Sequence, residues 1–486
     1  MFSILKKSNS LFQPILLAAI ILLSRLPFLG LGYGAEEDSW GTPLAIWNTI
    51  ETDTYEPSRL PGHPVQEAFY LLVAYSGPFA FNIFSALACV GACLAFFYIF
   101  KKLNFQNGFI SALALGFTPV IYISSTYTID YCLTLCFLLW AFYFLLDEKP
   151  LLTGIFLALA VGCRITTGIM ILPFCLWLYT FSPRDKFIKS SLQIFGTMTI
   201  LGCLAYWPLI YNFGYRFFHY YDLFPYPPIE KIIYKASFGV WGVLGLLGII
   251  SASISQLIFF RNRTIENPTI YKKPLIALFA IVFFLFLSSY IRLPQKSGYW
   301  ITVIPFAILF LRVWLNQMLY TFTCICIIAS SFFFSLGLTD SYRGSEYSRH
   351  ATTFSSAGQT IFLDPITGPM YADYTKRVNK EKFCEEVINS MLSQPKDSLE
   401  KQVLICGWWY NELMTESKVR KLKLEKNFGF YLPKRNILDL KKEGKTLYFL
   451  PEQAVFNDQY SGMEDGFTAK TAGDFEEAFI SSNRPQ

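Results

Sequence analysis

The sequence carries little charge for its length. Asp, Glu, Lys and Arg make up 16% of the 486 residues, whereas hydrophobic residues make up 53% and aromatic residues 18%. This composition excludes an ordinary soluble protein and predicts insertion into a membrane. The net charge of +6 comes from short basic pairs between apolar runs. Such pairs are typical of cytoplasmic loops, so the charge does not indicate a nucleic-acid-binding surface, and no nucleic-acid partner is expected.

Several common motifs are missing. The 11 cysteines form no CxxC pair and no Cys/His ligand spacing, and all but Cys384 and Cys406 lie in apolar runs, which is typical of core residues. No small-residue cleavage pattern follows the first apolar run, although Lys6 and Lys7 precede it. This run is therefore predicted to be retained as a first helix. The chain also lacks long internal repeats and low-complexity tracts.

Long apolar runs fill the first 338 residues. A helix needs about 20 apolar residues to cross the hydrocarbon core, and fewer when it is tilted or sheltered by protein. The segments near Gly108 and Leu151 are short or interrupted, so their ends are expected to lie inside the membrane and line a cavity. Eleven transmembrane helices are predicted, beginning near Pro14, Phe79, Gly108, Thr128, Leu151, Gly168, Ser191, Ser237, Pro274, Tyr299 and Met318.

The basic residues predict the orientation of these helices, because cytoplasmic gaps are enriched in Lys and Arg. The long first loop, residues 30–77, is then predicted to face outward, and an odd helix count places the C-terminus outside as well. The plasma (inner) membrane is the expected location. The predicted cytoplasmic gaps contain Lys6/Lys7, Lys101/Lys102, Lys149, Arg184/Lys186/Lys189, Arg261/Arg263, Lys272/Lys273 and Arg312.

Residues 339–486 are more polar and alternate strand-like and helix-like runs, which predicts a small extracytoplasmic α/β domain. The expected fold is thus an α-helical polytopic membrane protein, residues 1–338, followed by a soluble α/β domain. The runs are Thr360 to Leu363, a helix through Glu381 to Leu392, Gln402 to Trp408, Leu422 to Leu432, and Thr446 to Leu450.

The first outward loop opens with three consecutive acids, Glu36, Glu37 and Asp38. Apolar residues follow at helical spacing and predict an amphipathic helix along the membrane interface, with the acids at its N-terminus. The acids are either a solvated turn that caps this helix or part of a reaction site. The apolar positions are Trp40, Leu44, Trp47 and Ile50.

Later in the same loop, prolines and a glycine surround Arg59 and His63. Such a rigid loop fixes polar side chains well. Arg59 is a candidate to bind phosphate through its planar guanidinium group. His63 is a candidate to hydrogen-bond a phosphate or to bind a divalent metal ion, and the alternative is a structural loop histidine.

Four further ionisable residues stand at predicted outer ends of helices. An acid at the depth of Asp130 is costly unless it faces a cavity or a partner, which favours a functional role. Arg164 either pairs with Asp130 or contacts a ligand anion. Arg292 and Lys296 flank another outer turn, where they bind phosphate or extend to the interface as ordinary lysines and arginines do.

The order of these motifs resembles the GT-C superfamily of membrane glycosyltransferases, particularly the branch with protein O-mannosyltransferases and the lipid A aminoarabinose transferase. The resemblance covers roughly residues 20–310. It rests on the Arg-x-Pro ending the first helix, the acids of the long first loop, the stretch SRLPGHP, the acid opening the fourth helix, and the segment GCRITTG.

This resemblance implies transfer of a sugar from a polyprenyl-phosphate donor to a glycan, lipid or protein acceptor on the outer face. Asp38 matches the loop acid of the family and Asp130 the acid of helix four, although the base could equally be Glu37. A carboxylate would take the acceptor's proton, and the outer arginines and Lys296 would hold the leaving phosphate. Two alternatives fit many helices and buried charges: a transporter of lipid-linked or small polar substrates, and a non-enzymatic assembly subunit.

Overall fold

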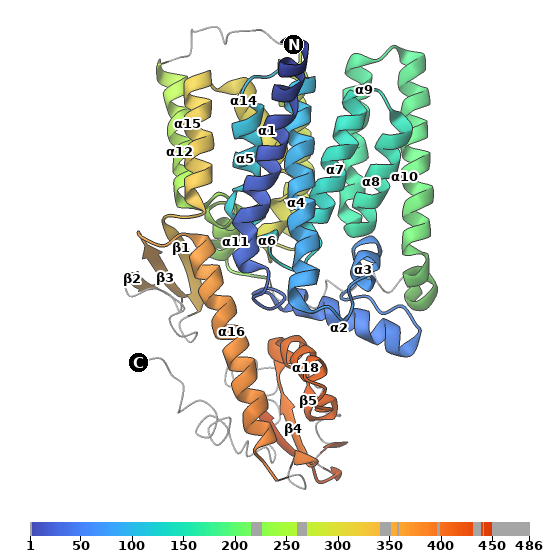
Figure 1. Cartoon of the computed structure of the whole chain (residues 1–486), viewed down its shortest axis with the longest axis vertical. Coiled ribbons are helices and arrows are strands. Elements are labelled where there is room, and N and C mark those ends of the chain that lie inside the picture. Colours follow the sequence, from blue (N-terminus) through green and yellow to red (C-terminus); the bar gives the residue numbers. More distant parts are fainter. Residues whose placement is uncertain are drawn as a thin grey trace.

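The computed structural model is a bundle of long helices with smaller elements gathered at one end (Figure 1). It describes residues 2–214, 226–259, 270–340, 351–356, 359–395, 399–430, 439–440 and 442–449. The bundle contains α1 (Phe2–Arg25), α4 (Gly77–Lys102), α5 (Gly108–Gly116), α6 (Pro119–Ser124), α7 (Tyr131–Leu146), α8 (Pro150–Cys163), α9 (Ile171–Phe181), α10 (Arg184–Phe213), α12 (Phe238–Phe259), α13 (Lys272–Arg292), α14 (Ile304–Trp314) and α15 (Gln317–Ser330).

Every predicted membrane segment contains a helix. Among the residues that the structure describes, five helices are long and apolar enough to cross a bilayer: α1, α4, α10, α12 and α13. The most apolar stretch of α4 is 61% buried, whereas those of the other four are only 22–28% buried. Helix α4 therefore lies at the centre, and the outer helices expose apolar side chains that require lipid as their solvent. The chain is a multi-pass membrane protein. Membrane crossing by the shorter helices stays a prediction.

The predicted interruption near Gly108 is present as the break between α5 and α6. Pro119 begins α6 and Thr118 is extended, with φ −61° and ψ 127°. Proline has no N–H to donate and disfavours helical backbone at the residue before it, so one apolar run becomes two short helices. Helix α8 is also short, at 14 residues, and ends where Arg164 becomes extended.

Ion pairs show which gaps between helices share an end of the bundle. At one end Lys102 contacts Asp147 and Lys186 contacts Glu148, so three of the lysine-rich gaps meet there. At the other end Lys296 contacts Glu36, so the first loop meets the turn after α13. This arrangement matches the predicted alternation, while the side of the membrane that each end faces stays a prediction.

The first loop forms α2 (Glu37–Thr52), which lies across that second end, and α3 (Pro64–Leu71) (Figure 1). The predicted helix is present, but its aromatic face does not anchor in lipid. Trp40 and Trp47 are buried by protein, in a cluster with Tyr33, Tyr70 and Phe81. The prediction that these aromatic side chains anchor the helix in the membrane interface is wrong, because Tyr33, Tyr70 and Phe81 of the same chain cover them.

The C-terminal elements include two three-stranded sheets. β1 (Ser335–Asp340), β2 (Thr352–Ser356) and β3 (Gln359–Asp364) form an antiparallel sheet in the order β1-β3-β2. β4 (Gln402–Ile405), β5 (Phe428–Gly429) and β6 (Thr446–Phe449) form a parallel sheet in the order β5-β4-β6. Helices α16 (Pro369–Leu392) and α18 (Tyr410–Val419) pack on the second sheet.

This C-terminal part is connected to the membrane bundle by side-chain packing as well as by the covalent chain. Strand β1 follows α15 directly and begins before residue 339, the predicted boundary. Leu44 of α2 packs in one apolar cluster with Ile388 of α16 and Leu413 of α18. An independently soluble α/β domain therefore stays a prediction. The contacts show that the C-terminal helices α16 and α18 pack against α2 of the first loop.

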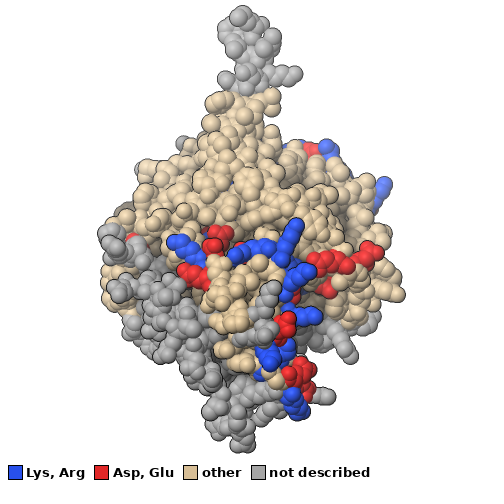
Figure 2. All heavy atoms as spheres, turned by 60° about the horizontal axis from the view of Figure 1, so that its bottom comes forward, with Lys and Arg blue, Asp and Glu red and all other residues tan. Residues whose placement is uncertain are grey.

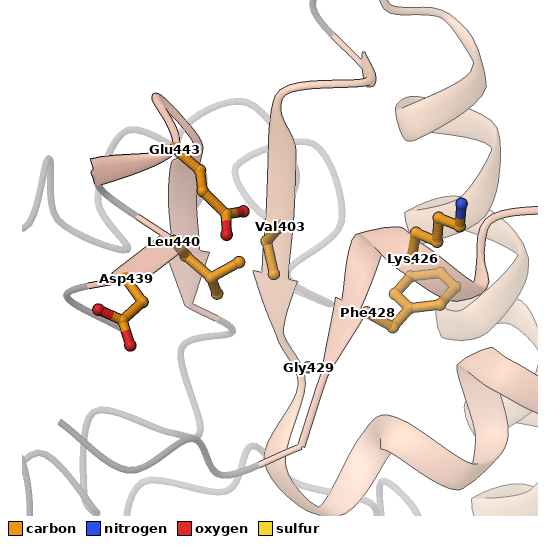
Figure 3. A pocket seen from close by; sticks show the side chains of 7 residues that line it. All are labelled: Val403, Lys426, Phe428, Gly429, Asp439, Leu440 and Glu443. Atoms are coloured by element: carbon orange, nitrogen blue, oxygen red, sulfur yellow. The ribbon is translucent and has the colours of Figure 1, made fainter. Parts of the chain in front are cut away.

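A cavity of about 340 Å³ opens beside the parallel sheet (Figure 3). Its lining contains none of the predicted site residues. It consists of Val403, Lys426, Phe428, Gly429, Asp439, Leu440 and Glu443.

Candidate active site

The three loop acids lie at the start of α2, as the sequence predicts. Glu36 is extended and caps the helix with its backbone, and Glu37 and Asp38 occupy the first turn. Carboxylates are favourable there because the free N–H groups give this end of a helix a partial positive charge. The helix thus holds Asp38 at the end of the bundle, where Figure 2 shows red and blue atoms gathered in a band below a largely uncharged surface.

Arg59 joins the loop acid to the acid of α7. Its Nη2 donates to Asp130 Oδ1 at 2.6 Å, and its Nη1 contacts the Asp38 carboxylate. The loop is shaped for this by Gly62, which has φ +87°, and whose N–H donates to Arg59 O at 2.7 Å. A Cβ at residue 62 would lie 2.4 Å from Leu209 Cδ1, so no larger residue fits without a shift.

Asp130 is 1% exposed and ends the loop immediately before α7. Besides Arg59 it contacts Arg164, whose Nη1 donates to Asp130 Oδ2 at 3.0 Å. The Arg164 guanidinium also lies over the rings of Tyr131 and Tyr299, 4.9 and 4.6 Å from their centroids. Of the two roles open to Arg164, the structure shows the pairing with Asp130, and it supplies the partner that a buried acid requires.

Lys296 reaches the same acids from the turn after α13. Its Nζ lies 2.7 Å from Glu36 Oε2 and 3.8 Å from Glu37 Oε1, and it also contacts Asp38. Burial alone would raise the pKa of the Asp38 carboxyl, but Arg59 and Lys296 together hold this pKa below its usual range. Asp38 is therefore ionised at neutral pH, as a proton acceptor must be.

His63 is buried, and both of its ring nitrogens have partners. Nδ1 lies 2.6 Å from Cys163 O, and Nε2 accepts from Arg59 Nε at 3.0 Å. Burial lowers the pKa of His63, so the ring is neutral with its proton on Nδ1. A histidine bonded in this way orients Arg59 and has no free nitrogen for a metal ion. Within the described residues no group of three or more His, Cys, Asp or Glu is placed to hold one.

The structure leaves Arg292 outside this charge network. It ends α13, is exposed, and has no ion-pair partner among the residues that the structure describes. The network itself, defined here as Glu36, Glu37, Asp38, Arg59, Asp130, Arg164 and Lys296, has one more acid than cations.

Two further residues near the network could not be recognised as part of the site from the sequence around them. Glu67 is 1% exposed and accepts from Ser58 N at 2.8 Å and Ser58 Oγ at 2.6 Å, so it holds the loop that carries Arg59. Lys235 ends α11 (Ile229–Ala236) and donates to Gln295 O beside Lys296. Burial, with a contribution from Lys231, lowers the pKa of Lys235 to about 8.

The fold and this network define a multi-pass membrane protein with a partly buried set of carboxylates and cations around the buried Asp130, at one end of the bundle. Residues 61–208 match the family model of dolichyl-phosphate-mannose-protein mannosyltransferases. The match confirms the resemblance to the GT-C superfamily and supports a membrane glycosyltransferase. It includes His63, Asp130 and Arg164 but not the loop acids, Arg59 or Lys296. No curated protein matches the chain.

Proposed function

We propose that this protein transfers a sugar from a polyprenyl-phosphate donor to a glycan, lipid or protein acceptor on the extracytoplasmic side of the plasma (inner) membrane. The observation that carries the proposal is the bridge of Arg59 between Asp38 and Asp130, at the membrane end where a lipid phosphate must sit. The bridge places a candidate base beside candidate phosphate ligands, as transfer from a phosphate donor requires.

In the proposed reaction the bond between the anomeric carbon and the phosphate oxygen breaks, and the acceptor oxygen bonds to that carbon. The acceptor's proton passes to Asp38, and the lipid phosphate leaves as an anion held by cations. Asp38 fits the base better than Glu37 because it contacts both Arg59 and Lys296, whereas Glu37 lies 3.8 Å from Lys296. Asp130 is almost fully buried, so we assign it to orienting the two arginines.

The donor phosphate is proposed to bind among Arg59, Arg164, Arg292 and Lys296. Three of these cations are already paired with acids, so an arriving phosphate would compete with Asp38 for Arg59 and Lys296. Donor binding would then release Asp38 from its cations and make it a stronger base. Arg292 has no acid to displace among the described residues. Arg216 and His219, a further candidate phosphate site, lie outside the described residues.

Transfer of labelled mannose from polyprenyl-phosphate-mannose into native membranes tests the proposal, because the family match names mannose. We expect incorporation with the parent chain and at least about 10²-fold less with Asp38→Asn. A transporter would move the labelled lipid across vesicles without a new glycosidic bond, and an assembly subunit would do neither. The position of the charges at one membrane end, instead of the midplane, argues against a transporter.

Sidedness is tested separately with tags that can be labelled only from one face. Tags at Lys101, Arg184 and Lys272 should be cytoplasmic, and tags near Asp53, Lys231 and the C-terminus should be outside. A cytoplasmic C-terminus would contradict an outward-facing site, because α16 and α18 lie at the same end as the loop acids.

A further inference from the structure

The C-terminal helix α16 buries an arginine against the first loop. Arg377 is 1% exposed, and its Nε donates to Leu31 O at 2.8 Å while its Nη2 lies 3.4 Å from Gly32 O. Its Nη1 also donates to Thr126 Oγ1 at 3.0 Å. A buried guanidinium group is costly unless its donors are satisfied, so these carbonyls fix where α16 meets the chain just before the acids.

The packing at this contact leaves no space for a side chain at Gly32. Gly32 has φ +51°, and a Cβ there would lie 2.7 Å from Trp40 Cζ2 and 2.9 Å from Glu381 Oε1. The turn that leads into α2 is therefore enclosed between α2 on one side and α16 on the other.

Helix α18 holds α2 itself. Thr415 Oγ1 donates to Trp40 O at 3.0 Å, and Asn411 Nδ2 donates to Glu37 O at 3.4 Å. These two carbonyls flank Asp38 in the sequence. Further along α2, Lys418 Nζ donates to Asn48 Oδ1 at 2.7 Å.

The two C-terminal helices are tied to each other. The largely buried side chain of Lys380 on α16 forms an ion pair with the buried Glu412 on α18, and Lys380 Nζ also lies 5.0 Å from the centre of the Trp409 ring. They therefore act on the first loop as one body, called here the α16–α18 clamp.

We propose that the α16–α18 clamp positions the acid-bearing loop for the reaction, and that Arg377 is its main positioning residue. This inference rests on the proposed function for its effect on catalysis, although the contact itself does not. Neither Arg377 nor Thr415 contacts the charge network in the described residues. They act through the backbone on both sides of Asp38, and a displacement of about 1 Å at a reacting group costs about 10²-fold in rate.

The contact is tested without any activity by a disulfide between residues 41 and 411. A Cβ at Gly41 would lie 3.0 Å from Asn411 Nδ2 and 3.5 Å from Asn411 Cγ, so Gly41→Cys with Asn411→Cys should cross-link on mild oxidation. Mass spectrometry of the linked peptides measures the yield. Adding Arg377→Gln should lower the yield, whereas adding Arg420→Gln should not. Arg420 is the control because its side chain bonds Asn389 of α16 on the exposed surface and, among the described residues, makes no hydrogen bond or ion pair with the first loop.

Sugar transfer by the full chain in nanodiscs tests the effect on catalysis. Arg377→Gln should reduce kcat about tenfold or more with little change in the KM for polyprenyl-phosphate-mannose, since misplacement weakens the chemical step more than donor binding. Arg377→Lys should recover part of the loss, and Arg420→Gln should match the parent. In an Asp38→Asn background, Arg377→Gln should cause no further loss of residual activity, because its effect passes through Asp38.

Should Arg377→Gln fail to fold, Thr415→Val keeps the shape, removes one hydrogen bond to the loop, and should give the same pattern at smaller size. Unchanged cross-linking and unchanged kcat in both variants would overturn the proposal, and so would equal fold losses with and without Asp38. If the parent transfers no sugar, the proposed function fails, while the cross-link still decides whether the clamp exists.

Discussion

The two ends of the helix bundle carry the same kinds of charged side chains in opposite settings. At the end with the lysine-rich gaps, Lys102 pairs with Asp147 and Lys186 with Glu148, and the lysines are 40% and 52% exposed. At the other end, Arg59 and Arg164 share Asp130, which is 1% exposed. Exposed pairs contribute about 0–1 kcal/mol each, whereas removing one partner of a buried pair costs about 3–5 kcal/mol. Among the described residues, the ion pairs at the second end are therefore the ones that are costly to break.

The largest expected effect is on catalysis. Asp38→Asn should reduce sugar transfer about 10²–10⁴-fold, because an amide cannot accept the acceptor's proton. Binding of a polyprenyl-phosphate analogue should be retained or tighter, since Arg59 and Lys296 lose a competing carboxylate. Kinetics and binding titrations in nanodiscs measure both. Glu37→Gln is the matched control: near-normal transfer by Asp38→Asn with a loss in Glu37→Gln would move the base to Glu37.

Asp130→Asn should lower the free energy of unfolding by about 3–5 kcal/mol, because two partly buried guanidinium groups lose the buried carboxylate that they share. Thermal unfolding in nanodiscs measures the change. Transfer should fall as well, since Arg59 would no longer be held. A variant as stable as the parent would show that Asp130 is not the anchor of the network.

Arginine-to-lysine changes should weaken donor binding although the charge is kept. Guanidinium groups grip phosphate with paired donors that an ammonium group lacks. Arg59→Lys, Arg164→Lys and Arg292→Lys are titrated with the same analogue, together with Lys296→Ala. If all four variants bind as tightly as the parent, the phosphate is held elsewhere, and the region of Arg216 and His219 is the next to test.

The pH dependence of stability should distinguish the network from an ordinary surface. Because the cations lower the pKa of Asp38 in the folded state, the stability it contributes is fully present above the unfolded pKa of about 3.9. That contribution is lost only as the pH falls further, through the folded pKa. The difference in unfolding temperature between the parent and Asp38→Asn should therefore be steady from neutral pH down to about pH 5 and should narrow below pH 4.

The smallest expected effect is at the opposite end. Asp147→Asn removes the partner of Lys102 and Lys149, which are largely exposed, so the unfolding free energy should change by less than about 1 kcal/mol. Sugar transfer should match the parent. A large loss of activity would show that the comparison between the two ends does not hold.

Features set by nearby residues could be predicted from the sequence. Long apolar runs predicted the helices, Pro119 falls at the break between α5 and α6, and the acids begin α2 as expected. Asp130 and Arg164 were singled out because buried charge is rare in apolar helices, and the structure pairs them.

Features that depend on distant parts of the chain could not be predicted. Nothing near Leu44 shows that α16 and α18 will cover it instead of lipid. Nothing in the sequence around Glu67 or Arg377 distinguishes them from ordinary charged residues. Only in the folded chain does Glu67 accept from the Ser58 N–H, and Arg377 donate to the Leu31 carbonyl. Arg292 is predicted among the phosphate-binding cations because it ends a long apolar helix at an outer turn, yet the structure leaves it exposed and outside the charge network.

We expect sugar transfer to occur at the charge network around Asp38 and nowhere else in the chain. Incorporation of labelled mannose from polyprenyl-phosphate-mannose into native membranes tests it most directly, with the parent, Asp38→Asn and Asp147→Asn compared at equal protein levels. The account predicts full incorporation with the parent and Asp147→Asn, and at least about a 10²-fold loss with Asp38→Asn. Equal incorporation by all three proteins would contradict it.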